Sequence, residues 1–118
     1  MSVTLFLDEP SAETVDTAEF SFRGWIAYDP ATIPTIAFHT LHRKLRTEFI
    51  ERPDVRNIMP SREVVGFQCR IALRDHLPSL NAGTLKVFVR CDGTIAGSFT
   101  FHIQKHALAS CIESALLT

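Results

Sequence analysis

The sequence lacks several features that would each assign it to a special class of protein. No apolar run approaches the roughly 18–20 residues of a membrane-spanning helix, so we expect no membrane insertion. The opening stretch, Met1 to Pro10, has no basic region ahead of its short apolar run, and we identify no signal peptide. Internal repeats and low-complexity tracts are also missing. With 118 residues, 46% hydrophobic and 21% charged, the chain is expected to form one globular domain.

Cysteine is scarce, and the chain contains three widely spaced cysteines: Cys69, Cys91 and Cys111. An odd number without a C-x-x-C pair predicts neither a disulfide framework nor a structural zinc site. Of the five histidines, His39 and His42 lie three apart in a predicted strand and so point to opposite faces, and His102 and His106 are separated by the junction of a strand and a helix. We therefore expect no metal, no cofactor and buried reduced thiols, which favours a cytoplasmic location.

Neither sign of charge dominates, because 12 basic and 13 acidic residues give a net charge of −1. This balance argues against nucleic acid as a partner, since such binding depends on neutralising many phosphates. The distribution is uneven, however: residues 41–90 hold ten basic and five acidic residues. Two interpretations stay open, an attraction for an anionic partner and a solvated strand face of mixed charge.

Alternation of apolar and polar residues dominates the chain and predicts strands. We expect seven of them, over residues 3–7, 20–28, 36–38, 45–50, 67–73, 85–91 and 95–103. The Asp92-Gly93 pair predicts a tight turn between the last two. The fold class is therefore all-β, an antiparallel immunoglobulin-like β-sandwich of about seven strands, with a small barrel as the alternative.

Two segments depart from this alternation. Pro53 at the first position of a helix predicts a short helical turn that ends before Pro60. The apolar residues of this turn, which are expected to close an open end of the sandwich, are Val55, Ile58 and Met59. The tail, residues 106–118, predicts a helix with one apolar face formed by Leu108, Ile112, Ala115 and Leu116. We divide the chain into a sandwich, residues 1–105, and this helix, which is either a linker to a further domain or a docking helix.

No catalytic motif is present, and the sequence offers one kind of binding chemistry. Sugar rings stack on exposed Trp or Tyr, while nearby Asp and Arg bind the hydroxyls. Trp25 and Tyr28 lie three apart on one strand, which places them on opposite faces and leaves Trp25 outside. A β-bulge at Gly24 would reverse this and bury Trp25, the commoner role of Trp in a small sandwich.

Five short motifs follow one another along residues 20–103: Phe22-Arg23-Gly24-Trp25-Ile26-Ala27, Arg52-Pro53-Asp54-Val55, Pro60, Gly66-Phe67 and Cys91-Asp92-Gly93-Thr94. In this order they resemble the small β-sandwich accessory domains attached to bacterial glycosyltransferases and sugar-linked methyltransferases of surface-polysaccharide synthesis. Met59 departs from that pattern, which tends to have an aromatic residue before the proline.

The resemblance implies a non-catalytic accessory module of a polysaccharide-processing enzyme that binds saccharide weakly or positions an adjacent catalytic domain. It supplies no catalytic residue. The residues we assign to ligand binding are Trp25, Tyr28, Arg52 and Asp54. A purely structural role for Arg52 and Asp54, tying down the loop around Pro53, stays open. The alternative function is a protein–protein interaction or homodimerisation domain, suggested by the terminal helix and open sheet edges.

Overall fold

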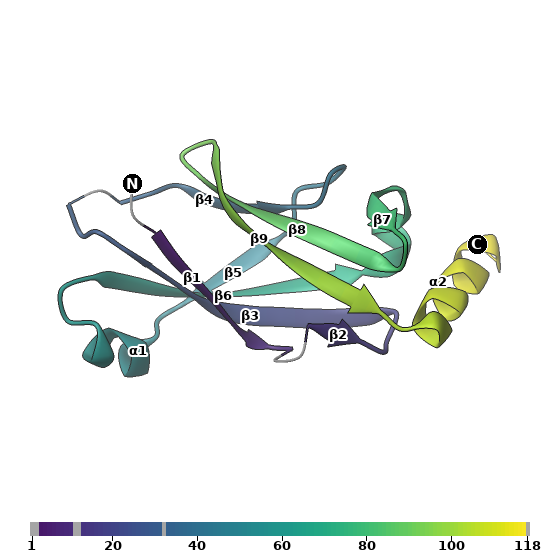
Figure 1. Ribbon diagram of the computed structural model, residues 1–118, viewed down its shortest axis with the longest axis horizontal. Coiled ribbons are helices and arrows are strands. Elements are labelled where there is room, and N and C mark those ends of the chain that lie inside the picture. The colour runs from purple at the N-terminus through teal and green to yellow at the C-terminus, as the bar shows by residue number, and fades with distance from the viewer. Residues whose placement is uncertain (1–2, 11–12, 32, 118) are drawn as a thin grey trace.

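The computed structural model describes residues 3–10, 13–31 and 33–117, with the side chains of these residues as far as Glu113. Most of the chain forms strands, which build two sheets (Figure 1). Sheet A has the strand order β1 (Val3–Glu9), β3 (Glu19–Tyr28), β6 (Glu63–Ala72) and β5 (Thr47–Ile50). Sheet B has the order β2 (Thr14–Val15), β9 (Thr94–Ile103), β8 (Thr84–Cys91) and β4 (Ile36–His39), with β7 (Leu80–Asn81) beside β8. The helices are α1 (Pro53–Ile58), the 3₁₀-helix η1 (Leu73–Ser79) and α2 (Lys105–Leu117).

The prediction of a β-rich fold with few helices is confirmed, but three details of it are wrong. The described residues contain nine strands, because β2 and β7, of two residues each, join the seven predicted ones. Two residues are too short to show an alternating pattern. The pairing is also not purely antiparallel, since β2 runs parallel to β9. The last residue of the predicted strand 67–73 begins η1.

The core lies between the sheets and is built around Phe22 of β3. Its ring centroid lies 5.2–6.2 Å from those of four other phenylalanines that sheets A and B contribute: Phe38, Phe67, Phe99 and Phe101. Every second residue of the long strands points into this layer, as their alternation predicts. Three free cysteines are also buried, as predicted.

A second, smaller apolar cluster lies on the outer face of sheet A. There α1 places Val55 over Ala27 and Val64, with Trp25 and Met59 packed against them. The expectation that α1 closes an open end of the sandwich is therefore wrong, because the helix covers a sheet face. Ile58 takes no part and is 79% exposed.

The C-terminal helix packs on η1 by a face different from the predicted one. Ala107 and Cys111, one helical turn apart, are buried in the main core, whereas Leu108 is half-buried and Ile112 is half-exposed. The predicted face was displaced by one residue, which is about 100° around a helix. Its remaining members, Ala115 and Leu116, lie outside the described side chains. Figure 1 shows α2 and α1 at opposite ends of the sandwich.

The burial of the core predicts a large contrast between two leucine truncations. Leu85 of β8 is fully buried, whereas Leu41 is 69% exposed. We expect Leu85→Ala to lower the free energy of unfolding by about 2–5 kcal/mol and Leu41→Ala to change it by less than about 0.5 kcal/mol. Urea denaturation measures both. Equal losses in the two variants would contradict the assignment of the core.

Candidate functional site

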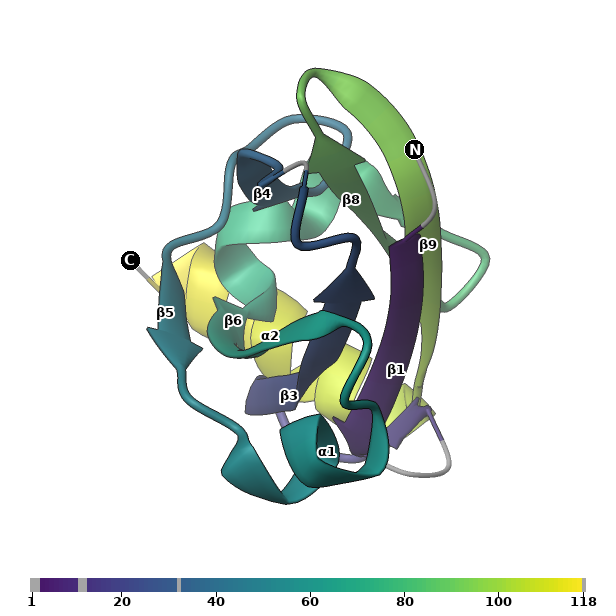
Figure 2. The same ribbon diagram turned by 90° about the vertical axis from the view of Figure 1, so that its left-hand side faces the viewer.

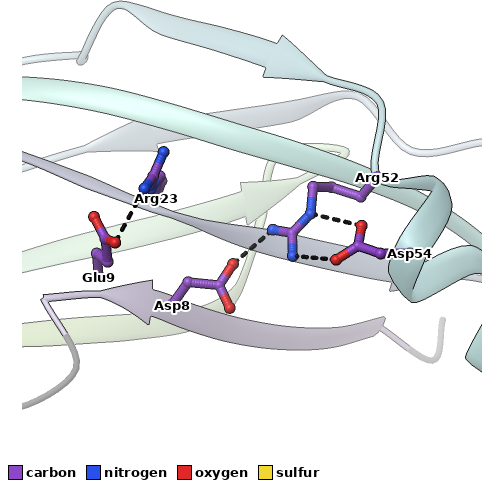
Figure 3. A network of polar contacts seen from close by, with 5 residues as sticks. All are labelled: Asp8, Glu9, Arg23, Arg52 and Asp54. Carbon is purple, nitrogen blue, oxygen red and sulfur yellow. Dashed lines mark hydrogen bonds and ion pairs between the residues drawn. The ribbon is translucent and has the colours of Figure 1, made fainter.

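The guanidinium of Arg52 joins β1 to the start of α1 (Figure 3). Its Nε and Nη2 donate to the two carboxylate oxygens of Asp54 at 3.1 and 2.9 Å, which is a bidentate pair. Its Nη1 donates to Oδ2 of Asp8 at 2.6 Å. Three charge-assisted hydrogen bonds therefore fix one side chain that is only 25% exposed.

The sequence makes room for this arrangement at Gly66. A Cβ atom there would lie 2.6 Å from Cγ of Arg52 and 2.8 Å from the carbonyl oxygen of Ile50. The Arg52 stem thus lies on bare backbone of β6. The hydrogen bonds to Asp54, and then the one to Asp8, raise the pKa of the Arg52 guanidinium, while Arg52 lowers the pKa of the Asp54 carboxyl.

A second ion pair lies beside the first on sheet A. Nη2 of Arg23 donates to Oε1 of Glu9 at 3.0 Å, and both side chains are largely exposed. Between the pairs is a hollow of about 350 Å³, which we call the glycine depression, lined by Gly24, Gly66, Ile50 and Phe67 together with the paired residues Asp8, Glu9, Arg23 and Arg52. Its lining combines charged side chains with the apolar side chain of Ile50, which is 41% exposed, so it can take a small polar ligand with an apolar face.

Trp25 lies on the outer face of sheet A, the face that also carries Arg23. The pairing of β3 with β6 runs without interruption through Gly24, so the considered bulge at Gly24 is absent and the simple alternation holds. The register shift occurs instead in β1, between Leu7 and Glu9. Trp25 is half-buried all the same, because the ring of Phe6 stacks on it at 5.4 Å and the α1 cluster flanks it.

Tyr28 lies apart from the other predicted binding residues. It lines a separate hollow of about 320 Å³ with Pro34, Ile36, Phe49 and Val65. The structure therefore brings Arg52 and Asp54 into contact and places Trp25 on the same outer face, but it does not bring Tyr28 to them. Arg52 and Asp54 do tie down the loop around Pro53, the structural role left open above.

A groove of about 750 Å³ next to the depression was not predicted. It is lined by Arg43, Lys44, Arg46 and Arg70 and by the acidic or neutral residues Glu19, Ser21, Glu48, Gln68 and Asp75, with His76 at its wall. Its residues come from three separate parts of the sequence, which strand pairing brings together. The excess of basic residues between positions 41 and 90 was the signal that could have pointed to it.

The three thiols are buried, and both ring nitrogens of His39 are hydrogen-bonded. Burial raises the pKa of the Cys69 thiol to about 11 and also raises the pKa values of Cys91 and Cys111. His39 Nδ1 donates to the Thr40 carbonyl oxygen, so its Nε2 accepts from Arg90 Nε at 2.8 Å. Within the described ranges, no three His, Cys, Asp or Glu side chains are grouped to hold a metal ion. In the same ranges, no helix has the length and apolar character needed to cross a membrane.

Comparison of the chain with protein-family models, with curated proteins and with solved structures gives no match in any of the three.

The Arg52 network predicts that replacing this arginine by lysine lowers the stability of the fold. Lysine keeps the charge but cannot form the bidentate pair, so we expect Arg52→Lys to lower the free energy of unfolding by about 1 kcal/mol. The matched control is Arg56→Lys, because Arg56 forms an exposed pair with Glu63, and we expect a change below about 0.5 kcal/mol.

The same variant also tests the electrostatics. In Arg52→Lys we expect the pKa of Asp54 to rise toward the usual carboxyl range in a carboxyl-detected NMR titration. A lowered carboxyl pKa stabilises the fold only above that pKa. The stability difference between wild type and variant should therefore shrink as the pH falls below about 4. An unchanged Asp54 pKa would show that Arg52 does not hold this carboxylate in solution.

Proposed function

We propose that this chain is a non-catalytic accessory module that binds saccharide weakly beside a catalytic domain of a polysaccharide-processing enzyme. The observation that carries the binding part is the glycine depression. Two ion pairs at its rim offer donors and acceptors to sugar hydroxyls, and the stacked rings of Phe6 and Trp25 lie on the same outer face. Saccharide sites combine these two elements.

The non-catalytic part is supported by how the described ionisable groups are used. Arg52 pairs with Asp8 and Asp54, Arg56 pairs with Glu63, and the three thiols are buried with raised pKa values. A nucleophile or general acid–base pair needs an accessible group with a pKa poised for reaction. The buried thiols, held reduced, also support a cytoplasmic location. The polysaccharide-processing partner rests on the resemblance of the ordered motifs between residues 20 and 103.

We further propose that the sandwich is immunoglobulin-like. An immunoglobulin sandwich has four strands in the order A-B-E-D facing a sheet of C, F and G. Here β1-β3-β6-β5 faces β4-β8-β9, with the same sequence of connections. The N-terminal segment contributes β1 to sheet A and β2 to sheet B, so it edges both sheets (Figure 1).

A second candidate function, dimerisation or binding of a protein partner, is favoured by one edge of sheet A. Among the described strands β5 pairs with β6 alone, and its residues Phe49 and Ile50 are 50% and 41% exposed. Phe49 also lines the apolar hollow of Tyr28, next to β4. Figure 2 shows β5 and β4 as edge strands on the same side of the molecule. An open edge with apolar side chains is a surface that a second chain can cover.

The saccharide function predicts a localised response to sugars. In a ¹H–¹⁵N NMR titration with oligosaccharides at millimolar concentration, we expect shifts of the Gly24, Gly66 and Ile50 amides. Arg23→Gln should weaken binding about tenfold, because it removes one charged donor at the rim. Arg56→Gln, which removes a paired arginine outside the depression, is the control. Absence of any residue-specific shift with neutral and acidic sugars alike would end the binding proposal.

The second function predicts self-association that depends on Phe49. Sedimentation velocity would show a concentration-dependent dimer for the wild type and a monomer for Phe49→Ser. Ile58→Ser, at an equally apolar and more exposed position on α1, should leave the dimer intact. A wild-type chain that stays monomeric at millimolar concentration would rule out homodimerisation.

A further inference from the structure

The groove of about 750 Å³ brings together basic residues from two distant parts of the sequence. Three cations line one wall, which is the segment between β4 and β5; we call Arg43, Lys44 and Arg46 the basic wall. The floor is the outer face of β3 and β6, and η1 closes the far side.

The segment that carries the basic wall is held in place from several directions. The backbone N–H of Thr40 donates to the Arg43 carbonyl oxygen at 2.8 Å, and that of Leu45 donates to Phe38 at 2.8 Å. The Leu45 side chain is buried in the main core. The Thr40 hydroxyl lies 3.0 Å from Nδ1 of the buried His76. A ligand that binds here meets a wall that is already ordered, which reduces the entropic cost of binding.

The cations of the basic wall are available for a ligand. Nη2 of Arg70 donates to Glu19 at 3.0 Å, so that pair is satisfied internally. For the part of the chain that the structure describes, no carboxylate lies within ion-pair distance of the three wall cations, all of which are exposed. The lining of the groove, with four basic and three acidic residues, therefore carries a small net positive charge, and among the described residues the three cations of the basic wall are not held in ion pairs.

The other groups in the groove decide which kind of anion fits. Glu48 and Asp75 line it together with the neutral side chains of Ser21 and Gln68. These carboxylates repel every anion, and the repulsion is larger for a ligand with a phosphate on each unit, such as nucleic acid, than for one whose charges are fewer and separated. They accept hydrogen bonds from hydroxyl groups, as do amide and hydroxyl oxygens. A ligand with many hydroxyls and a few separated negative charges satisfies both sets of groups.

The groove and the glycine depression adjoin each other along the outer face of sheet A. Each of three strands supplies one residue to the groove and the next residue on the same face to the depression: Ser21 and Arg23, Gln68 and Gly66, Glu48 and Ile50. Residues two apart on a strand are separated by about 6.6–6.8 Å. An extended chain of sugar rings laid along the strands can reach both hollows.

We propose that the outer face of sheet A binds an acidic oligosaccharide lengthwise, with its carboxylates against the basic wall and its neutral part in the glycine depression. This inference rests on the proposed saccharide function, and it adds the ligand class and the second half of the site.

The test is an NMR titration of the whole chain with two probes of equal length, a hyaluronan hexasaccharide, in which uronate and neutral sugars alternate, and maltohexaose, at low ionic strength. The hyaluronan hexasaccharide is expected to bind more tightly and to shift the amides of Ser21, Gln68 and Glu48 as well as those of the depression. The triple variant Arg43→Gln, Lys44→Gln, Arg46→Gln should weaken its binding by about tenfold or more and leave maltohexaose unaffected. The matched control removes the same charge elsewhere, at Arg56, Lys86 and Lys105, and should change the affinity less than twofold.

Four results would overturn the inference. Equal affinity for the two probes, with shifts confined to the depression, would contradict the preference for an acidic ligand but agree with the proposed saccharide function. Equal weakening in the triple variant and its control would mean that only net charge matters. Tighter binding of a thymidine hexanucleotide at the same amides would assign the groove to nucleic acid. No shift with either sugar would remove the proposed function as well. Urea denaturation of both triple variants checks that they are folded.

Discussion

The unbroken register between β3 and β6 is the constraint on which the rest of the structure depends. Both strands have ten residues, and they pair continuously from Glu19 opposite Ala72 to Tyr28 opposite Glu63. Because side chains alternate between the faces of a strand, this single register places Phe22 in the core and Arg23 and Trp25 outside. A slip of one residue would exchange the two faces of sheet A and expose the phenylalanine cluster. The core and the candidate site are therefore specified by the same pairing.

The outer face of sheet A combines three environments in sequence along its strands. Near α1 it is apolar, where Val55 and Met59 cover Ala27 and Val64. The glycine depression follows, where the Arg52 stem lies against Gly66, and the groove with its basic wall comes last. A face that changes from apolar to charged over a few residues suits a ligand that is itself amphiphilic, and sugars are of this kind.

Local patterns predicted what depends on neighbours in sequence, and they missed what depends on contacts. Alternation identified the long strands, and Asp92-Gly93, with φ of 54° and 81°, forms the expected two-residue turn. Ala82-Gly83 makes a similar turn with φ of 51° and 79°, but alanine carries no such signal, so β7 was missed. Of the site, the Arg52–Asp54 pair was within reach because the two residues lie close in sequence. The partner Asp8 and the groove depend on strand pairing, which no short window contains.

The N-terminal segment forms an edge strand of each sheet, and the pairing of its second strand, β2, affects how the fold responds to tension. β2 runs parallel to β9, and two backbone hydrogen bonds of 2.8 Å, from His102 to Glu13 and from Gln104 to Val15, join the two segments. Tension that enters through β1 and leaves through α2 pulls these parallel segments lengthwise in opposite directions. The two bonds are then sheared together rather than peeled one after the other. Because both bonds must break at once, this pairing resists extension along the strands more than an antiparallel pair opened from one end.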